Sequence, residues 1–371
     1  MKANNVLGII FSNMHDDKIG EMTATRTMGS IPFGGRYRLI DFPLSNMVHS
    51  EIKTVGVITK SNYQSLMDHL GSGKAWDLSR KRDGLFILPP FGHGNSVYRT
   101  RIEALNGIMS FLKGAKQDYV VLSDCNIVAT MDFSDIISFH KEKNADITVV
   151  YKNMERPDNG AESLVLSCIG KNGRIKELLI SPETEGKHPC AVNIFVAGRE
   201  FLIKQISDCV SRNKESFLRD VLQSNVNDFK FFGYKFDGYL RLITSMNSYY
   251  QANMELQQAE VRKALFNSAP VYTKIRDAMP ALYSYDSKVE NSLIADGCVI
   301  DGKVENSIIF RNVKIGRHSI IRNSIIMQGT EIGENCDISY AILDKDVIMG
   351  DDRRIFALEN SLHYIGKGTN L

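Results

Sequence analysis

A short motif, Asn-Ser followed by an apolar residue and an isoleucine, recurs at Asn291, Asn306 and Asn323. In the same region aliphatic side chains return every five or six residues, at Ile315, Ile321, Met327, Ile332 and Ile338. A period of about six residues is typical of a parallel β-helix, in which each short strand turns one aliphatic side chain into a triangular coil. Residues 289–371 are therefore predicted to form a left-handed β-helix of hexapeptide repeats. Its exposed edges would serve either as a stability cap or as a platform for assembly with another subunit.

The chain before this repeat follows another pattern. From Val6 to about residue 265, short β-branched runs alternate with helical stretches, which predicts a doubly wound, mainly parallel α/β domain over residues 1–265. Strands are expected at residues 6–11, 54–59, 119–122, 146–151, 164–168 and 192–196, and helices at 61–70, 102–112, 134–143, 200–212 and 244–264. A polar connector over residues 266–288 begins at the helix-breaking run Asn267 to Pro270. The ligand site of such a domain lies beyond the carboxyl ends of its strands.

Composition excludes several classes of protein. A net charge of +2 over 371 residues gives no reason to expect nucleic acid or a membrane surface as a partner. Six scattered cysteines without close spacing indicate neither a zinc site nor a disulfide framework, and they fit a reducing cytoplasm. The first apolar run, Val6 to Phe11, is too short for a signal peptide or a membrane span. A cytoplasmic location is expected.

Two stretches carry a family resemblance: residues 32–46, PFGGRYRLIDFPLSN, and residues 71–78, GSGKAWDL. They resemble the bacterial glucose-1-phosphate adenylyltransferases, also called ADP-glucose pyrophosphorylases. The likeness runs nearly end to end, through residues 139–143, 251–256 and 327–333. It implies a nucleotidyltransferase fold, an oligomeric assembly, and a reaction in which ATP and glucose 1-phosphate give ADP-glucose and diphosphate with Mg²⁺.

The same resemblance shows replacements where the family binds phosphate. Counting back from Pro32, Asn13, Met14 and Asp16 stand where the family has glycines, and Lys18 stands where it has an arginine. Two lysines are replaced as well, by Met28 and by Ser181. Side chains at the glycine positions obstruct the approach of backbone to phosphate, and Lys18 lacks the two-pronged guanidinium. The phosphate loop is therefore expected to be degenerate.

The metal-binding carboxylates are replaced too. Where the family has Ser-Gly-Asp-His, this chain keeps Ser123 but has Asp124 at the glycine position and Cys125 at the aspartate position. Leu242 stands at the second aspartate. A thiol is a poor ligand for Mg²⁺, and a leucine is none. Tyr98 survives from the substrate loop, so Tyr98, Ser123 and Asp124 are interpreted as remnants of a substrate pocket.

These losses predict a largely non-catalytic, regulatory subunit. As the resemblance implies, it would assemble with a catalytic paralogue into a hetero-oligomer, expected to be a tetramer, or with itself. No cofactor is expected, and Mg²⁺ would be needed only by an active enzyme. One alternative is a weak adenylyltransferase in which Asp124 and Lys18 take over the lost roles.

Other readings stay open. His15, Asp16 and Asp17 would form either a new metal site or a solvated loop, and His318 or His363 would have to act as base in a hexapeptide-repeat acyltransferase. A structural protein similar to the nucleotidyltransferase-like subunits of translation-factor exchange complexes is a further option.

Basic residues in loops near the expected cleft suggest a site for phosphorylated metabolites acting as effectors. They are Arg36, Arg38, Arg80, Arg99 and Arg101, with Lys81 and Arg82 beside them. The alternative is that they form an ordinary solvated surface.

Overall fold

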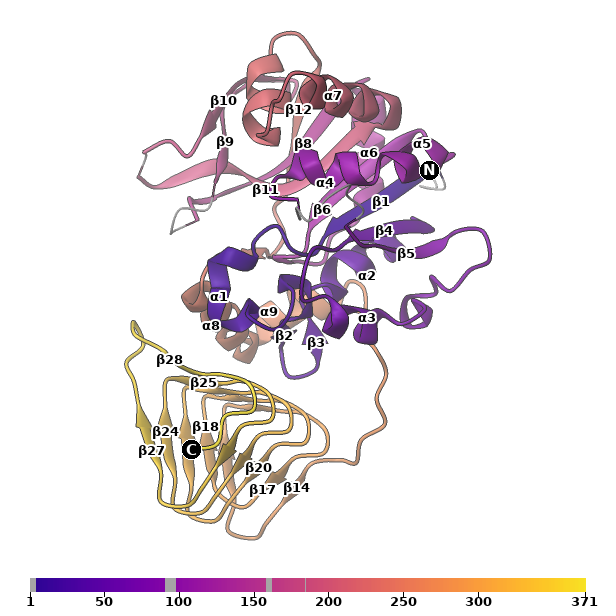
Figure 1. Ribbon diagram of the computed structural model, residues 1–371. Coiled ribbons are helices and arrows are strands. Elements are labelled where there is room, and N and C mark those ends of the chain that lie inside the picture. The colour runs from indigo at the N-terminus through magenta and orange to yellow at the C-terminus, as the bar shows by residue number, and fades with distance from the viewer. Residues whose placement is uncertain (1–4, 91–97, 158–161, 184) are drawn as a thin grey trace.

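The computed structural model describes residues 5–90, 98–157, 162–183 and 185–371. A layered α/β domain ends with helix α9 (Ala259–Phe266), and a three-sided solenoid begins at strand β14 (Leu282–Tyr283) and lies below it in Figure 1. The solenoid begins before residue 289, the start expected from the repeats, because its first strands precede the first Asn-Ser tetrad. No helix in the described part of the chain has the length and apolar character of a membrane span.

A nine-stranded mixed sheet forms the centre of the first domain, with the order β10-β9-β11-β6-β1-β4-β5 and with β8 joining β11 to β12. Strand β1 is parallel to β4 and β6, and β4 is parallel to β5, as the βαβ pattern predicts. Strand β11, in contrast, is antiparallel to β6, β8 and β9. The strands are β1 (Val6–Phe11), β4 (Thr54–Ile58), β5 (Gly84–Leu88), β6 (Tyr119–Asp124), β8 (Ile147–Glu155), β9 (Leu164–Ile169), β10 (Ile175–Ile180), β11 (Lys187–Gly198) and β12 (Phe231–Lys235).

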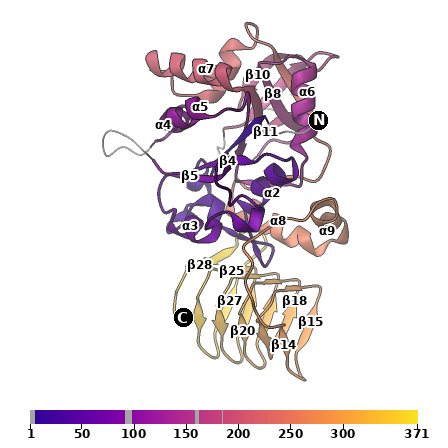
Figure 2. The ribbon, with the colours of Figure 1, turned by 90° about the vertical axis from the view of Figure 1, so that its right-hand side faces the viewer.

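Helices cover both faces of this sheet (Figures 1 and 2). They are α2 (Asp41–His49), α3 (Gln64–Leu70), α4 (Arg101–Gly107), α5 (Met109–Gly114), α6 (Phe133–Glu142), α7 (Arg199–Ser211), α8 (Met246–Met254) and α9. One hydrophobic core contains residues of α2 and α6, and a second contains residues of α4, α5 and α7. Two expectations were wrong: the helices over 102–112 and 244–264 are each broken in two, because the backbone leaves helical geometry at Ile108 and at Gln258.

The solenoid consists of three parallel five-stranded sheets, the arrangement of a left-handed β-helix. The first sheet contains β14, β17 (Val299–Ile300), β20 (Lys314–Ile315), β23 (Glu331–Ile332) and β26 (Ile348–Met349). The second contains β15 (Lys288–Glu290), β18 (Lys303–Glu305), β21 (Ile320–Arg322), β24 (Asp337–Ser339) and β27 (Arg354–Phe356). The third contains β16 (Leu293–Ile294), β19 (Ile308–Ile309), β22 (Ile325–Ile326), β25 (Ala341–Leu343) and β28 (His363–Ile365).

The Asn-Ser tetrad builds one corner of the coil. Asn306 has a φ of 45° and Asn323 a φ of 46°, in the left-handed region that asparagine tolerates better than most residues. The following serines form a ladder, since the backbone N–H of Ser324 donates to Ser307 Oγ at 3.1 Å and that of Ser307 donates to Ser292 Oγ at 3.0 Å. The repeated motif therefore turns the chain and satisfies buried backbone donors.

The third sheet of the solenoid is buried on both faces. Ile309 and Ile326 belong to the solenoid core, whereas Ile308 and Ile325 belong to the core of the first domain. The two adjacent aliphatic residues of each tetrad thus serve two different cores. A buried ion pair between Arg26 Nη2 and Asp344 Oδ2, 2.7 Å apart, crosses the same junction.

Candidate functional site

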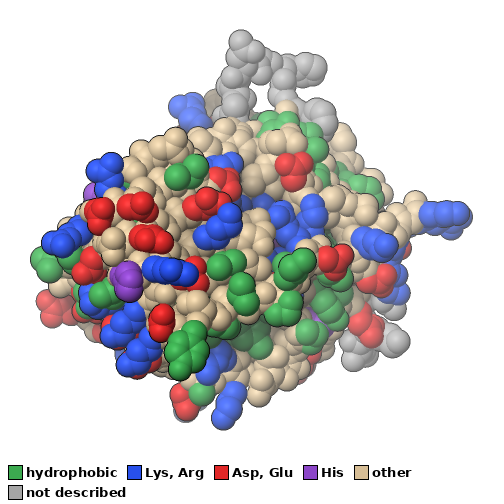
Figure 3. Space-filling view, turned by 90° about the horizontal axis from the view of Figure 1, so that it is seen from below, with side chains coloured by type: hydrophobic (Ala, Val, Ile, Leu, Met, Phe, Trp, Pro, Cys, Tyr) green, Lys and Arg blue, Asp and Glu red, His purple; other side chains and the backbone are tan. Residues whose placement is uncertain are grey.

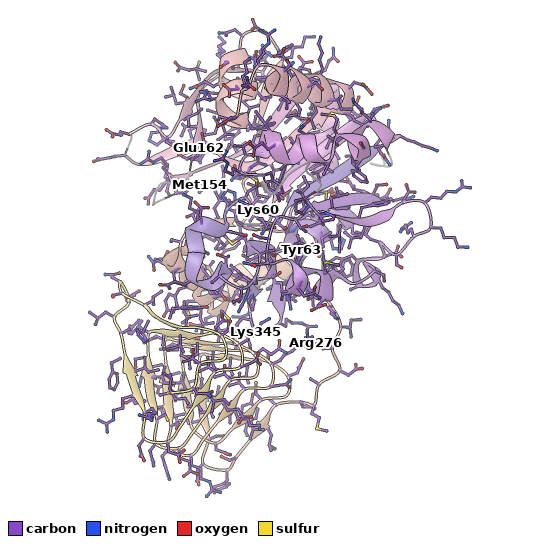
Figure 4. All side chains as sticks on the ribbon, in the orientation of Figure 1. Lys60, Tyr63, Met154, Glu162, Arg276 and Lys345 are labelled. Atoms are coloured by element: carbon purple, nitrogen blue, oxygen red, sulfur yellow. The ribbon has the colours of Figure 1, made fainter. Side chains whose placement is uncertain are left out.

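The candidate site lies where the parallel strands of the first domain end. Phe11 ends β1 and pairs with Asp124 at the end of β6 and with Ile58 at the end of β4. The loops after β1 and β6 therefore meet at one edge of the sheet, as expected for a doubly wound fold. Lys60, which follows β4, and Met154 on β8 are labelled close to each other in the first domain in Figure 4.

The centre of the site is a buried ion pair. Arg101 Nη1 and Nη2 donate to the two oxygens of Asp124, each at 2.8 Å, and His15 Nε2 lies 2.7 Å from Asp124 Oδ2. Burial alone would raise the pKa of Asp124, but Arg101 and His15 outweigh it and hold that pKa below its usual value. Asp124 is thus a carboxylate whose charge is neutralised inside the protein.

Two features hold Arg101 in place. Thr100 caps α4 in a capping box with Glu103, which makes Arg101 the first residue of the helix. The guanidinium lies over the ring of Phe11, 4.5 Å from its centroid, with Phe195 and Phe217 each 5.7 Å away. From the sequence, Arg101 was expected to lie in a loop near the cleft and to bind an anionic effector, and its partner Asp124 was missed. The Thr-x-x-Glu spacing, however, signals a helix that begins at this residue.

The loop after β1 is closed by its own side chains. Asp16 Oδ1 accepts the backbone N–H of Met28 at 2.7 Å, and Asn13 Nδ2 donates to Asp16 Oδ2. Asn13 Oδ1 accepts the backbone N–H of Lys60 at 3.0 Å, which ties the loop to the end of β4. Burial raises the pKa of Asp16 to about 6, against the opposing effect of these hydrogen bonds.

Three residues at positions that are catalytic in the resembled family lie in the hydrophobic core. Met28, Cys125 and Leu242 belong to the first core, and all are less than a tenth exposed. Burial raises the pKa of the Cys125 thiol well above its ordinary value, so the thiol stays protonated. These side chains support packing at positions where the family uses charge.

The remaining predicted positions are spread around the cleft. Met14 and Tyr98 pack against the second core, and the buried Ser123 hydroxyl donates to the carbonyl of Asp124. Lys18 forms an ion pair with Asp17 at 3.2 Å. Ser181 lies after β10, where its φ is 47° and its backbone N–H donates to Ser163.

The arrangement does not fit magnesium. Within the described ranges, no three or more His, Cys, Asp or Glu side chains are grouped so that they could hold a metal ion. Both oxygens of Asp124 already accept hydrogen bonds from Arg101. His15, Asp16 and Asp17 do not converge either, since His15 contacts Asp124, Asp16 contacts Met28, and Asp17 is exposed beside Lys18.

The structure separates the five arginines that were expected to form an anion site. Arg101 is buried against Asp124, Arg80 pairs with Asp77 at the surface, and Arg99 lines a cavity between β5, α4 and the end of α7. Arg36 and Arg38 share a pocket, which lies at the junction of the two domains.

That junction pocket is strongly basic. Besides Arg36 and Arg38 it is lined by the cationic side chains of Lys274, Arg276, Arg311 and Lys345. Burial lowers the pKa of Lys345 to about 7, helped by the nearby Arg38 and Arg26. Figure 4 shows Arg276 and Lys345 at this junction. No local motif marks these residues in the sequence, because connector, solenoid and first domain each supply part of the lining.

Comparisons with known proteins agree with the architecture. The nucleotidyl transferase family model matches residues 17–259, and a model of the GlmU-like C-terminal hexapeptide region matches residues 281–357. The glycogen biosynthesis protein GlgD of Bacillus subtilis (strain 168) is 36% identical over 352 residues, which cover 94% of this chain and 92% of that protein. The glucose-1-phosphate adenylyltransferase of Clostridium botulinum (strain Alaska E43) is 32% identical over 328 residues, which cover 87% of this chain and 84% of that enzyme. The chain therefore belongs to the glucose-1-phosphate adenylyltransferase family of nucleotidyltransferases, and within it is similar to GlgD.

Proposed function

We propose that this chain is a regulatory, largely non-catalytic subunit of an ADP-glucose-forming assembly in bacterial glycogen biosynthesis. The observation that carries the proposal is the buried pairing of Asp124 with Arg101, which occupies both oxygens of the carboxylate at the end of β6. The similarity to GlgD, a protein named for glycogen biosynthesis, supports the pathway.

The size of the expected defect supports a non-catalytic role. Loss of one preorganised charge-stabilising group typically reduces the rate by about 10²–10³. Here Cys125 and Leu242 stand at both metal-carboxylate positions and are packed in the core. Such losses do not simply add, but either one alone would make turnover slow.

The contacts disfavour the alternative of a weak enzyme with a rearranged site. Asp124 would have to exchange Arg101 for a metal ion, and Lys18 would have to serve the phosphates while it pairs with Asp17. Leaving one member of a buried ion pair without its partner, as Arg101 would then be, typically costs about 3–5 kcal/mol. The pairing of Asp124 with Arg101 therefore opposes metal binding in the cleft.

The partner we propose is a catalytic member of the same family, in a hetero-oligomer of four chains. Exposed apolar side chains on the solenoid and its connector support an assembly surface there; they are Met279, Leu282, Tyr285, Ile348, Phe356 and Leu358. Figure 3 views the molecule from this side and shows hydrophobic groups exposed among charged ones.

We also propose that the junction pocket receives the phosphate group of an effector. The basic part is narrow, with a volume of about 30 Å³, so it fits a single small anionic group. An adjoining cavity of about 280 Å³ shares Gly35, Arg36 and Tyr37 with it and offers room for the rest of a metabolite. Because the pocket is built from both domains, an anion there would strengthen their contact.

The test is an ADP-glucose synthesis assay of this chain alone, of a catalytic relative alone, and of the two co-expressed, with and without fructose 1,6-bisphosphate. We expect no turnover from the chain alone and an altered effector response in the mixture. K345M should weaken that response, and K314M, at an exposed lysine of the solenoid, should leave it unchanged. Brisk turnover by the isolated chain, or only separate homo-oligomers on size exclusion, would refute the proposal.

A further inference from the structure

Charged side chains in the cleft are paired with other groups of the same chain. Asp124, at the end of β6, is one residue before the position of the metal-binding aspartate in the resembled family, so it is the nearest carboxylate that could take a cation there. Arg101 lies against both of its oxygens. The guanidinium is enclosed by Phe11, Phe195 and Phe217 rather than by water. A planar guanidinium matches a carboxylate in a two-pronged geometry that a lysine does not reproduce.

A second charged group of the cleft, the Asp16 carboxylate, lies in the loop after β1. Asp16 stands where the resembled family brings backbone close to phosphate, and its carboxylate accepts the backbone N–H of Met28. Lys60 is close enough to oppose the rise in the pKa of Asp16, so a positive charge also faces this carboxylate. A carboxylate bound by a backbone N–H beside a lysine has the environment that a phosphate oxygen would need.

We propose that Arg101 and Asp16 are built-in substitutes for the ions that a nucleotidyltransferase cleft binds: Arg101 takes the cation position at Asp124, and Asp16 takes the anion position in the loop after β1. The cleft is thereby closed to both magnesium and triphosphate. The inference concerns the isolated chain and goes beyond the regulatory role.

The cation half is tested with Mn²⁺ as a spectroscopic probe, because carboxylate ligands suit it. Binding is followed by electron paramagnetic resonance in the full-length wild type, in R101T and in R101T/D124N. Threonine is chosen because it removes the guanidinium and keeps a small polar side chain. We expect R101T to bind Mn²⁺ at least about tenfold more tightly than the wild type, and R101T/D124N to return to the wild-type level. An R101T protein that binds no more Mn²⁺ than the wild type would overturn the proposal.

A second comparison keeps the test valid if R101T does not fold. The wild type and D124N should bind Mn²⁺ equally weakly, because Asp124 is already occupied. Fluorescence of Trp76, the single tryptophan, reports whether each variant is folded. A wild-type protein that binds Mn²⁺ and loses it in D124N would show that Asp124 is an open metal site.

The anion half is tested by calorimetry with inorganic tripolyphosphate. D16N removes the charge and keeps the shape, so its affinity for tripolyphosphate should rise above that of the wild type. D17N is the matched control, because Asp17 is exposed and its substitution leaves the Met28 N–H occupied. Equal affinities of the wild type and D16N would refute this half. Neither half depends on a partner subunit, so failure here is distinguishable from failure of the proposed function.

Discussion

Removal of the charge on Asp344 should separate the unfolding of the two domains. Asp344 is 1% exposed, and its Oδ2 accepts from Arg26 Nη2 at 2.7 Å and from the Tyr364 hydroxyl at 2.6 Å. Arg26 belongs to the first domain and is also buried, so D344N would leave a guanidinium without its counterion inside the protein. Breaking a buried pair in this way typically costs about 3–5 kcal/mol.

The assay is denaturant unfolding followed by two signals. Trp76 is buried in the first domain, so its fluorescence reports on that domain alone, and circular dichroism reports on both domains. We expect the wild type to give coincident transitions. D344N should lower the unfolding free energy by about 3–5 kcal/mol and shift the two transitions apart.

A matched control is E331Q, which removes a charge from the exposed pair of Lys314 and Glu331 on the solenoid. Exposed pairs contribute about 0–1 kcal/mol, so this variant should unfold nearly as the wild type does. A loss of less than about 1 kcal/mol in D344N, with transitions still coincident, would refute the view that this pair couples the domains.

Three further predictions follow from the same structure. Burial lowers the pKa of Lys345 to about 7, so sulfate in the junction pocket should bind best below that pH, and its affinity should fall by up to about tenfold per pH unit above it. Calorimetry across this range should show this pH dependence in the wild type and not in K345M. I325A should destabilise the protein by about 2–5 kcal/mol because Ile325 is fully buried at the junction, whereas I348A, at an exposed position of the solenoid, should change the melting temperature little. N306A should lower the unfolding free energy by about 1–2 kcal/mol, because Asn306 has a positive φ that alanine adopts at a cost. N306G should be nearly neutral when both variants are compared by thermal unfolding.

Much of the fold could be predicted from the sequence because its periods are regular. The six-residue spacing of aliphatic side chains indicated the solenoid, and the β-branched runs indicated the parallel strands. The breaks at Ile108 and Gln258 were missed because the apolar pattern continues across both of them. The register between β11 and its neighbours depends on contacts distant in sequence, which local patterns do not encode.

The site was predictable only in part. Comparison of motifs identified Cys125 and Leu242 as replacements, and the structure places both in the core. The partner of Asp124 is 23 residues away in sequence and was not found, because no spacing rule links a helix start to the end of a strand. The junction pocket was missed for the same reason, since Lys345 approaches Arg38 only when the solenoid folds against the first domain.

The doubly buried sheet of the solenoid has a consequence for how the molecule can change in evolution. Ile308, Ile325 and Ile342 pair with one another in successive coils, and each occupies the same place at the junction. A coil here is 17 residues long, the separation of the stacked Ser307 and Ser324. The preceding coil, between the stacked Ser292 and Ser307, is only 15 residues long and still pairs Leu293 with Ile308. A change of length at a corner therefore leaves the stacked positions in place, whereas a whole added coil would extend the contact between the domains by one more aliphatic residue.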